Sequence, residues 1–136
     1  MNILIIDGQG GKLGAQIVKT VTETYPEAAV TAVGTNSVAT AAMLRGGAHH
    51  AATGENAVIV ACRKADVIIG PIAIVIADSL LGEVTPAMAV AVGQAGAARI
   101  LLPVSKCENL VAGVRDVPTA ELLSDTIKKL AAFAGK

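Results

Sequence analysis

The sequence predicts a doubly wound α/β fold, in which one parallel sheet lies between two layers of helices. Aliphatic runs of strand length alternate with segments of helical periodicity along the 136 residues, and this alternation is typical of parallel sheets with right-handed crossovers. Hydrophobic residues make up 53% of the chain but aromatic residues only 1%. The core must therefore be built from Ala, Val, Ile and Leu, which let helices pack closely on a sheet. The length fits a single small domain over residues 1–136.

The first half of the chain alternates three expected strands with three expected helices. Residues 3–6 are continuously aliphatic, which indicates a strand buried on both faces. Leu13, Ile17 and Val21 then recur at helical spacing. Further strands are expected at 29–33 and 48–52, and further helices from Asn36-Ser37 to Gly46-Gly47 and from Thr53 to about Ala65.

The second half contains the longest apolar run, which begins with an expected strand at 67–69. We expect Gly70-Pro71 to break this strand and residues 72–81 to form a buried helix that ends at Gly82. Thr85-Pro86 is a strong helix start, because Thr caps the N-terminus and Pro fits the first helical position. We expect the helix that begins at Thr85-Pro86 to end near Gly96. Strands at 99–103 and 110–114 and a last helix from Pro118-Thr119 complete the expected elements.

Composition and charge exclude several classes of partner. The 11 basic residues are balanced by 11 acidic ones, so we expect no nucleic-acid partner. The apolar run at 67–77 is shorter than the ~20 residues of a membrane-spanning helix, and no signal peptide is visible, so we expect a cytoplasmic protein. Cys62 and Cys107 are too few for a disulfide scaffold, and we expect free thiols. His49 and His50 would point to opposite faces of a strand, so we expect no metal site.

A glycine-rich turn follows the first expected strand. Residues 7–14 read DGQGGKLG, which fits G-x-x-G-x-x-G through Gly8, Gly11 and Gly14. We expect positive φ at Gly8 and Gly10, close approach of the backbone to a pyrophosphate at Gly11, and close helix–sheet packing at Gly14. Free N–H groups and the positive helix end would face the anion. The other candidate binding residues of this turn are Asp7, Gln9, Lys12 and Leu13. Asp7 could contact a ribose or fix the turn, and we favour the turn role. The alternative for the whole turn is a purely structural role.

The turn resembles the first strand–helix turn of NAD(P)-binding Rossmann proteins, especially short reductases with G-x-x-G-x-x-G. The resemblance continues at Gly47-Ala48 and at residues 65–69, and it implies bound NAD or NADP. Such domains carry an acidic residue about 20 positions on, which binds the ribose hydroxyls. Here the corresponding residues are Gly34, Thr35, Asn36 and Ser37. Their hydroxyls and amide could bind a ribose or a 2′-phosphate, so NAD, NADP and a mononucleotide stay open.

Over nearly its full length the chain is also similar to a small bacterial family, domain of unknown function 3842. The segments that carry this resemblance are residues 5–11 (IIDGQGG), 70–72 (GPI), 81–89 (LGEVTPAMA) and 100–103 (ILLP). The resemblance implies a fold, and no established activity comes with it.

Three other side chains are weak catalytic candidates. Asp78 and Glu83 precede the helix start at Thr85, and Lys106 follows the fifth expected strand within Ser105-Lys106-Cys107. Both segments should lie at the carboxyl ends of strands. There Asp78 or Glu83 could serve as a general acid or base, and Lys106 could bind an anionic group. The alternative for the two carboxylates is that they only cap and solvate a helix junction. Cys107, near Lys106, could be a thiol with a lowered pKa, and the alternative is a structural cysteine.

Two functional hypotheses follow. The first is a Rossmann module that binds a nucleotide or dinucleotide, with NAD(P) favoured, in a crevice formed by residues 8–14, 34–37 and Gly70-Pro71. If it is an enzyme, it would be an NAD(P)-dependent oxidoreductase. The second is an oligomeric interaction or regulatory protein whose glycine turn is structural, suggested by the excess of apolar residues, including the run at 72–81. We expect a homo-oligomer in either case.

Overall fold

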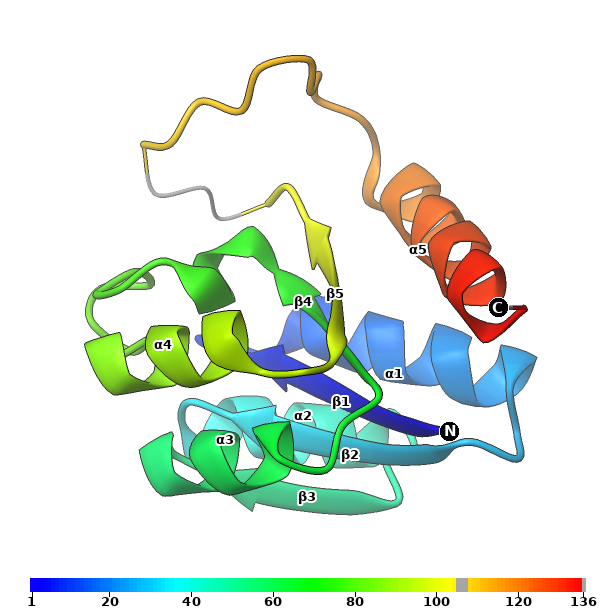
Figure 1. Ribbon diagram of the computed structural model, residues 1–136, viewed down its shortest axis with the longest axis horizontal. Helices are drawn as coiled ribbons and strands as arrows, with labels where there is room; N and C mark the ends of the chain where they lie inside the picture. Colours follow the sequence, from blue (N-terminus) through cyan, green and yellow to red (C-terminus); the bar gives the residue numbers. More distant parts are fainter. Residues whose placement is uncertain (105–107, 136) are drawn as a thin grey trace.

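The computed structural model describes residues 1–104 and 108–135 and contains one five-stranded sheet (Figure 1). All neighbouring strands are parallel, and their order is β3-β2-β1-β4-β5. The order reverses between β1 and β4, as the doubly wound fold requires. The strands are β1 (Asn2–Asp7), β2 (Ala29–Gly34), β3 (His50–Thr53), β4 (Val67–Pro71) and β5 (Ala98–Leu102).

Helices cover both faces of the sheet and give the three predicted layers. The α-helices are α1 (Lys12–Thr24), α2 (Ser37–Arg45), α3 (Glu55–Cys62), α4 (Pro86–Gln94) and α5 (Thr119–Ala134), and a short 3₁₀ helix is η1 (Ile72–Val75). Ile3 and Ile5 of β1 pack in the core with α1, α2 and α5. Leu4 and Ile6, which point to the other face, pack with α3, η1 and α4. This alternation confirms the predicted doubly wound fold.

The aliphatic strand β1 lies at the centre of the molecule. Residues 3–7 are all buried, and β1 is bonded to β2 on one side and β4 on the other. Each fully buried Ile stabilises the fold by about 1.5–3 kcal/mol. The carboxyl end of β1, where the glycine turn begins, is therefore anchored on a rigid support.

The prediction that Gly70-Pro71 breaks the fourth strand is wrong. β4 runs through Pro71, which ends the strand and therefore needs to donate little to the ladder. A side chain at Gly70 would collide with the backbone of Ile6 in β1. Glycine is present because β1 and β4 approach closely, and it does not end the strand.

The predicted helix at 72–81 is also wrong. Only η1 is helical, and the chain continues as a loop to Thr85. The run is apolar because Ala73, Ile74 and Leu80 are buried in the core beside α4. An apolar run alone does not distinguish a helix from buried irregular backbone.

Two further boundaries differ from the expectation. Helix α3 begins after Gly54, whose φ is 101°, and ends at Cys62 rather than Ala65. Thr53 does not cap it, because its hydroxyl lies 2.7 Å from the hydroxyl of Thr40. Residues 110–114 form no strand and are mostly exposed. Within residues 1–104 and 108–135, no helix combines the length and the apolarity needed to cross a bilayer.

Candidate functional site

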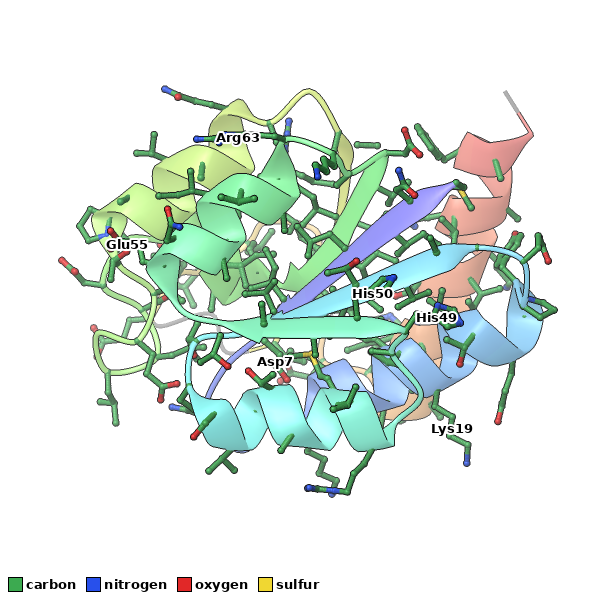
Figure 2. The ribbon with its side chains drawn as sticks, turned by 90° about the horizontal axis from the view of Figure 1, so that it is seen from below. Asp7, Lys19, His49, His50, Glu55 and Arg63 are labelled. Carbon is green, nitrogen blue, oxygen red and sulfur yellow. The ribbon has the colours of Figure 1, made fainter. Side chains whose placement is uncertain are left out.

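The buried carboxylate of Asp7 fixes the glycine turn at the carboxyl end of β1. Its Oδ1 accepts a hydrogen bond from the Gly8 N–H at 2.8 Å, and its Oδ2 accepts one from the Gly14 N–H at 2.6 Å. Burial raises the pKa of Asp7, as does the nearby Glu83 carboxylate, while the two hydrogen bonds oppose this shift. Figure 2 shows Asp7 between the sheet and the helices of the α1–α2 face. Both oxygens serve the turn, which confirms the structural role favoured for this residue.

The backbone of the turn differs from the expected one. Positive φ occurs at Gln9 (50°) and Gly11 (74°), so the expectation of positive φ at Gly8 and Gly10 is wrong. The turn is closed by a bond from the Gly11 N–H to the Gly8 carbonyl at 2.9 Å. Of these two left-handed residues, Gly11 immediately precedes α1, and its conformation favours glycine.

Three of the glycines contact other parts of the protein. A Cβ at Gly14 would lie 2.7 Å from the Asp7 Cβ and 2.6 Å from the Met43 Sδ, which confirms the predicted close packing. A Cβ at Gly11 would lie 2.6 Å from the Ala39 Cα in α2, so this glycine admits a helix and not a pyrophosphate. A Cβ at Gly8 would meet the Thr35 hydroxyl at 2.6 Å. Gly10 differs, because a Cβ there has nothing within 4 Å.

The turn leaves three backbone donors free. The N–H groups of Gly8 and Gly14 bond to Asp7, and that of Gly11 bonds within the turn. Gln9 donates to Glu83 at 2.8 Å. The N–H groups of Gly10, Lys12 and Leu13 have no acceptor within the described part of the chain. They lie at the positive end of α1, where an anion is favoured.

Glu83 joins the loop after β4 to the ends of β1 and β2. Its Oε1 accepts three hydrogen bonds: from the Gln9 N–H at 2.8 Å, from the Thr35 hydroxyl at 2.7 Å and from the Asn36 amide at 2.7 Å. The Asn36 amide also donates to the Gln9 carbonyl at 2.9 Å. Burial alone would raise the pKa of Glu83, but the hydrogen bonds from Gln9, Thr35 and Asn36 together lower it below its ordinary value. Glu83 is therefore ionised at neutral pH.

The second oxygen of Glu83 faces solvent. Oε2 accepts no hydrogen bond from the residues that the structure describes. Every buried side-chain oxygen and nitrogen among those residues has a partner, so Oε2 is not buried. One oxygen is thus fixed by three donors, and the other is available as an acceptor.

The loop that carries Glu83 has an unusual backbone. Asp78, Leu80 and Leu81 have φ values of 63°, 54° and 57°, in the left-handed region that such residues rarely adopt. The loop is held by a 2.7 Å bond from the Asp78 N–H to the Val84 carbonyl and by a 2.6 Å bond from the Ser79 hydroxyl to the Ala73 carbonyl. Non-glycine residues in this region cost about 1–3 kcal/mol each and persist where the surroundings impose them.

The end of β2 supplies most of the other predicted residues. The Thr35 N–H bonds to the Asp7 carbonyl at 3.0 Å, which brings it beside the turn. Asn36 caps α2 by accepting from the Ala39 N–H at 2.9 Å, as predicted. Gly34 ends β2, while Ser37 begins α2 and is exposed.

Several candidates do not join this group. Gly70 and Pro71 end β4, next to β1 in the sheet, and are buried. The Asp78 side chain makes no hydrogen bond or ion pair with the described residues. Ser105, Lys106 and Cys107 lie outside the described residues. Their predicted roles stay predictions.

The remaining titratable candidates lie away from the turn. His49 Nδ1 accepts from the Val30 N–H at 3.1 Å, and His50 begins β3, at the end of the strand remote from the turn (Figure 2). Cys62 is buried, and burial raises the pKa of its thiol. Among the described residues, no three His, Cys, Asp or Glu side chains gather as metal ligands.

Sequence reasoning did not foresee the position of Glu83. The sequence suggests a general acid or base at this residue, whereas the structure places it against Thr35 and Asn36 at the end of β2. The one signal in the sequence is the absence of an acidic residue at 34–37, where dinucleotide-binding domains carry one.

Comparison with known proteins identifies a family. No curated protein matches the chain. A dodecameric FMN-dependent UbiX-like decarboxylase from Escherichia coli O157:H7 is 17% identical, with a TM-score of 0.45, and the match covers 98% of this chain and 76% of that chain. A similarity at this level is no evidence of a shared ligand. The model of domain of unknown function 3842 (DUF3842) matches residues 2–134, so the chain belongs to this family, as the resemblance implied.

Proposed function

We propose that this domain binds a nucleotide or dinucleotide, with its phosphates on the first turn of α1. The observation that supports this most directly is the set of free N–H groups at Gly10, Lys12 and Leu13. Backbone N–H groups at a helix N-terminus suit phosphate oxygens, which accept hydrogen bonds and carry negative charge. The exposed Lys12 side chain adds a positive charge at the same place.

The position of this turn supports the same proposal. It follows β1, and the strand order reverses between β1 and β4. Ligands of doubly wound sheets bind beyond the carboxyl ends of the strands at this reversal. NAD and NADP are the ligands that the reductase-like turn favours, and an enzyme built on this site would be an NAD(P)-dependent oxidoreductase. The donor set suits their pyrophosphate, since three N–H groups stand free over four residues.

Calorimetric titration with NAD, NADP, FAD, FMN, ATP and S-adenosylmethionine tests the proposal. The informative variant is Gly10→Val, because a Cβ there has no heavy atom of the protein within 4 Å. The added bulk would stand beside the free N–H groups in the sequence and should hinder a phosphate that binds them. We expect wild-type protein to bind at least one of these nucleotides and Gly10→Val to bind it at least about tenfold more weakly.

Gly93→Val is the matched control, because a Cβ at Gly93 also has nothing within 4 Å and this residue lies in α4. It should bind like wild type. Absence of binding across the panel would overturn the proposal. Equal affinity of Gly10→Val and wild type would overturn the proposed place of the phosphates.

A second candidate function is association between copies of this chain. Strand β3 is at one edge of the sheet, and an edge strand offers unpaired backbone groups. A groove of about 400 Å³ lies beside it, lined in part by Val33, Ala52 and Val60. Light scattering of wild type and Val60→Asp tests this, with Val90→Asp on α4 as the control. An oligomer that only Val60→Asp disrupts supports the candidate, and a monomeric wild type removes it.

A further inference from the structure

We infer that Glu83 binds the ribose hydroxyls of the nucleotide, so that the site selects ligands with a free 2′,3′-diol, such as NAD, over 2′-phosphorylated ligands, such as NADP. This inference rests on the proposed function. It assigns to the loop after β4 a task that nucleotide-binding α/β domains usually give to an acidic residue at the end of β2.

The position of Glu83 is the first argument. Residues 34–37 at the end of β2 contain no carboxylate. Glu83 supplies one there, because its Oε1 lies 2.7 Å from both the Thr35 hydroxyl and the Asn36 amide. The carboxylate comes from another segment but stands where the ribose of a bound nucleotide is expected.

The spacing from the phosphate donors is the second argument. Glu83 Oε1 also accepts from the Gln9 N–H at 2.8 Å. The next residue, Gly10, contributes the first free N–H. A ribose and its phosphate are adjacent in a nucleotide, so one ligand can reach both groups.

The chemistry of the carboxylate is the third argument. Three donors hold Oε1 in place, while Oε2 faces solvent without a partner in the described part of the chain. A fixed carboxylate with a free oxygen is a strong acceptor for hydroxyl groups. Two adjacent ribose hydroxyls are donors that suit it.

The charge around Glu83 gives the selectivity. Glu83 forms no ion pair with any described residue, and residues 34–37 contain no Lys or Arg. A 2′-phosphate would therefore meet an uncompensated negative charge, and juxtaposed like charges are strongly unfavourable. A 2′-hydroxyl meets the same group as a hydrogen-bond donor.

Calorimetry of wild type, Glu83→Gln and Glu23→Gln tests the inference, with NAD, NADP, ADP and 2′-deoxy-ADP as ligands. Wild type should bind NAD at least about tenfold more tightly than NADP. It should also bind ADP more tightly than 2′-deoxy-ADP. Glu83→Gln should weaken NAD binding and abolish the preference over NADP. Glu23→Gln removes a charge from the last turn of α1, remote from the turn, and should behave as wild type.

The outcomes separate this inference from the proposed function. If wild type binds none of these four ligands and none of FAD, FMN, ATP and S-adenosylmethionine, the proposed function fails and the inference fails with it. If it binds one of those others but none of the four, only the inference is overturned. If wild type binds NADP as tightly as NAD, or ADP no better than 2′-deoxy-ADP, only the inference is overturned, and neither comparison depends on a variant that folds. If Glu83→Gln tightens binding of NAD and of inorganic phosphate alike, Glu83 is an internal anion that the ligand displaces, which also overturns the inference.

Discussion

Replacement of Asp7 by Asn should destabilise the domain by about 1–2 kcal/mol. Both carboxylate oxygens accept backbone bonds, from Gly8 at 2.8 Å and Gly14 at 2.6 Å. Asn keeps one acceptor oxygen, but its amide group would face a donor. One buried N–H therefore loses its partner, at a cost of about 1–3 kcal/mol. Burial and Glu83 raise the pKa of Asp7, which shows that burying its charge is costly. The neutral Asn side chain avoids this cost, so we expect a loss in the lower part of the range of about 1–3 kcal/mol.

Urea unfolding followed by circular dichroism measures this loss. Asp125→Asn is the control, because Asp125 is exposed and, among the residues that the structure describes, pairs only with Lys129 in α5 at 2.6 Å. Loss of this ion pair should cost about 0.3–0.5 kcal/mol. The denaturant slope should stay unchanged, since the same surface is exposed on unfolding. If Asp7→Asn is as stable as wild type, the carboxylate does not fix the turn, and the argument from its two bonds is refuted.

Three other predictions concern packing, acid stability and thiol reactivity. Gly14→Ala should destabilise the domain by about 1–2 kcal/mol, because overpacking against Asp7 exceeds the gain in helix propensity. Gly93→Ala, whose Cβ has nothing within 4 Å, should instead stabilise α4. Urea unfolding measures both changes, and the same sign for the two variants would contradict the packing argument. The hydrogen bonds to Glu83 lower its pKa against the opposing effect of burial. Glu83 therefore contributes to the free energy of unfolding above its ordinary pKa of 4.5, and this contribution is lost as the pH falls through the lower pKa of the folded state. In Glu83→Gln, the free energy of unfolding should therefore fall less steeply with decreasing pH below about pH 4.5. Asp7, with its raised pKa, has the opposite effect on this pH dependence. If the free energy of unfolding of Glu83→Gln has the same slope against pH as that of wild type, the result counts against the Glu83 contacts. Cys62 should react with iodoacetamide at least about tenfold more slowly in native protein than in urea, as peptide mass spectrometry can measure, and equal rates would contradict its burial.

Local signals account for the parts of the fold that the sequence predicted well. The aliphatic run at 3–6 indicates a doubly buried strand, and β1 is one. Thr85-Pro86 predicts a helix start, and Thr85 accepts the Met88 N–H at 3.2 Å as the N-cap of α4. Asn36 begins α2 in the same manner. In each case the deciding interaction lies within a few residues, so the local sequence contains it.

The errors come from residues whose role depends on distant parts of the chain. The sequence around Gly70 suggests a strand break, but this glycine admits the neighbouring backbone of Ile6, which lies 64 positions earlier. Glu83 bonds to Thr35, 48 positions away, and to Gln9, 74 positions away. No periodicity or local motif encodes contacts of this kind. They follow from the strand order, which places the ends of β1, β2 and β4 at one edge of the sheet.

The glycine pattern of the turn is not by itself evidence for ligand binding. Gly8, Gly11 and Gly14 each face protein atoms within 3 Å of an added Cβ, and internal packing explains all three. Gly10 has neither such a contact nor a left-handed φ, so a structural turn does not require glycine there. The case for a phosphate therefore depends on Gly10 and on the free N–H groups beside it. If Gly10 serves a ligand, bulk at this position should impair binding while leaving stability within about 0.5 kcal/mol of wild type.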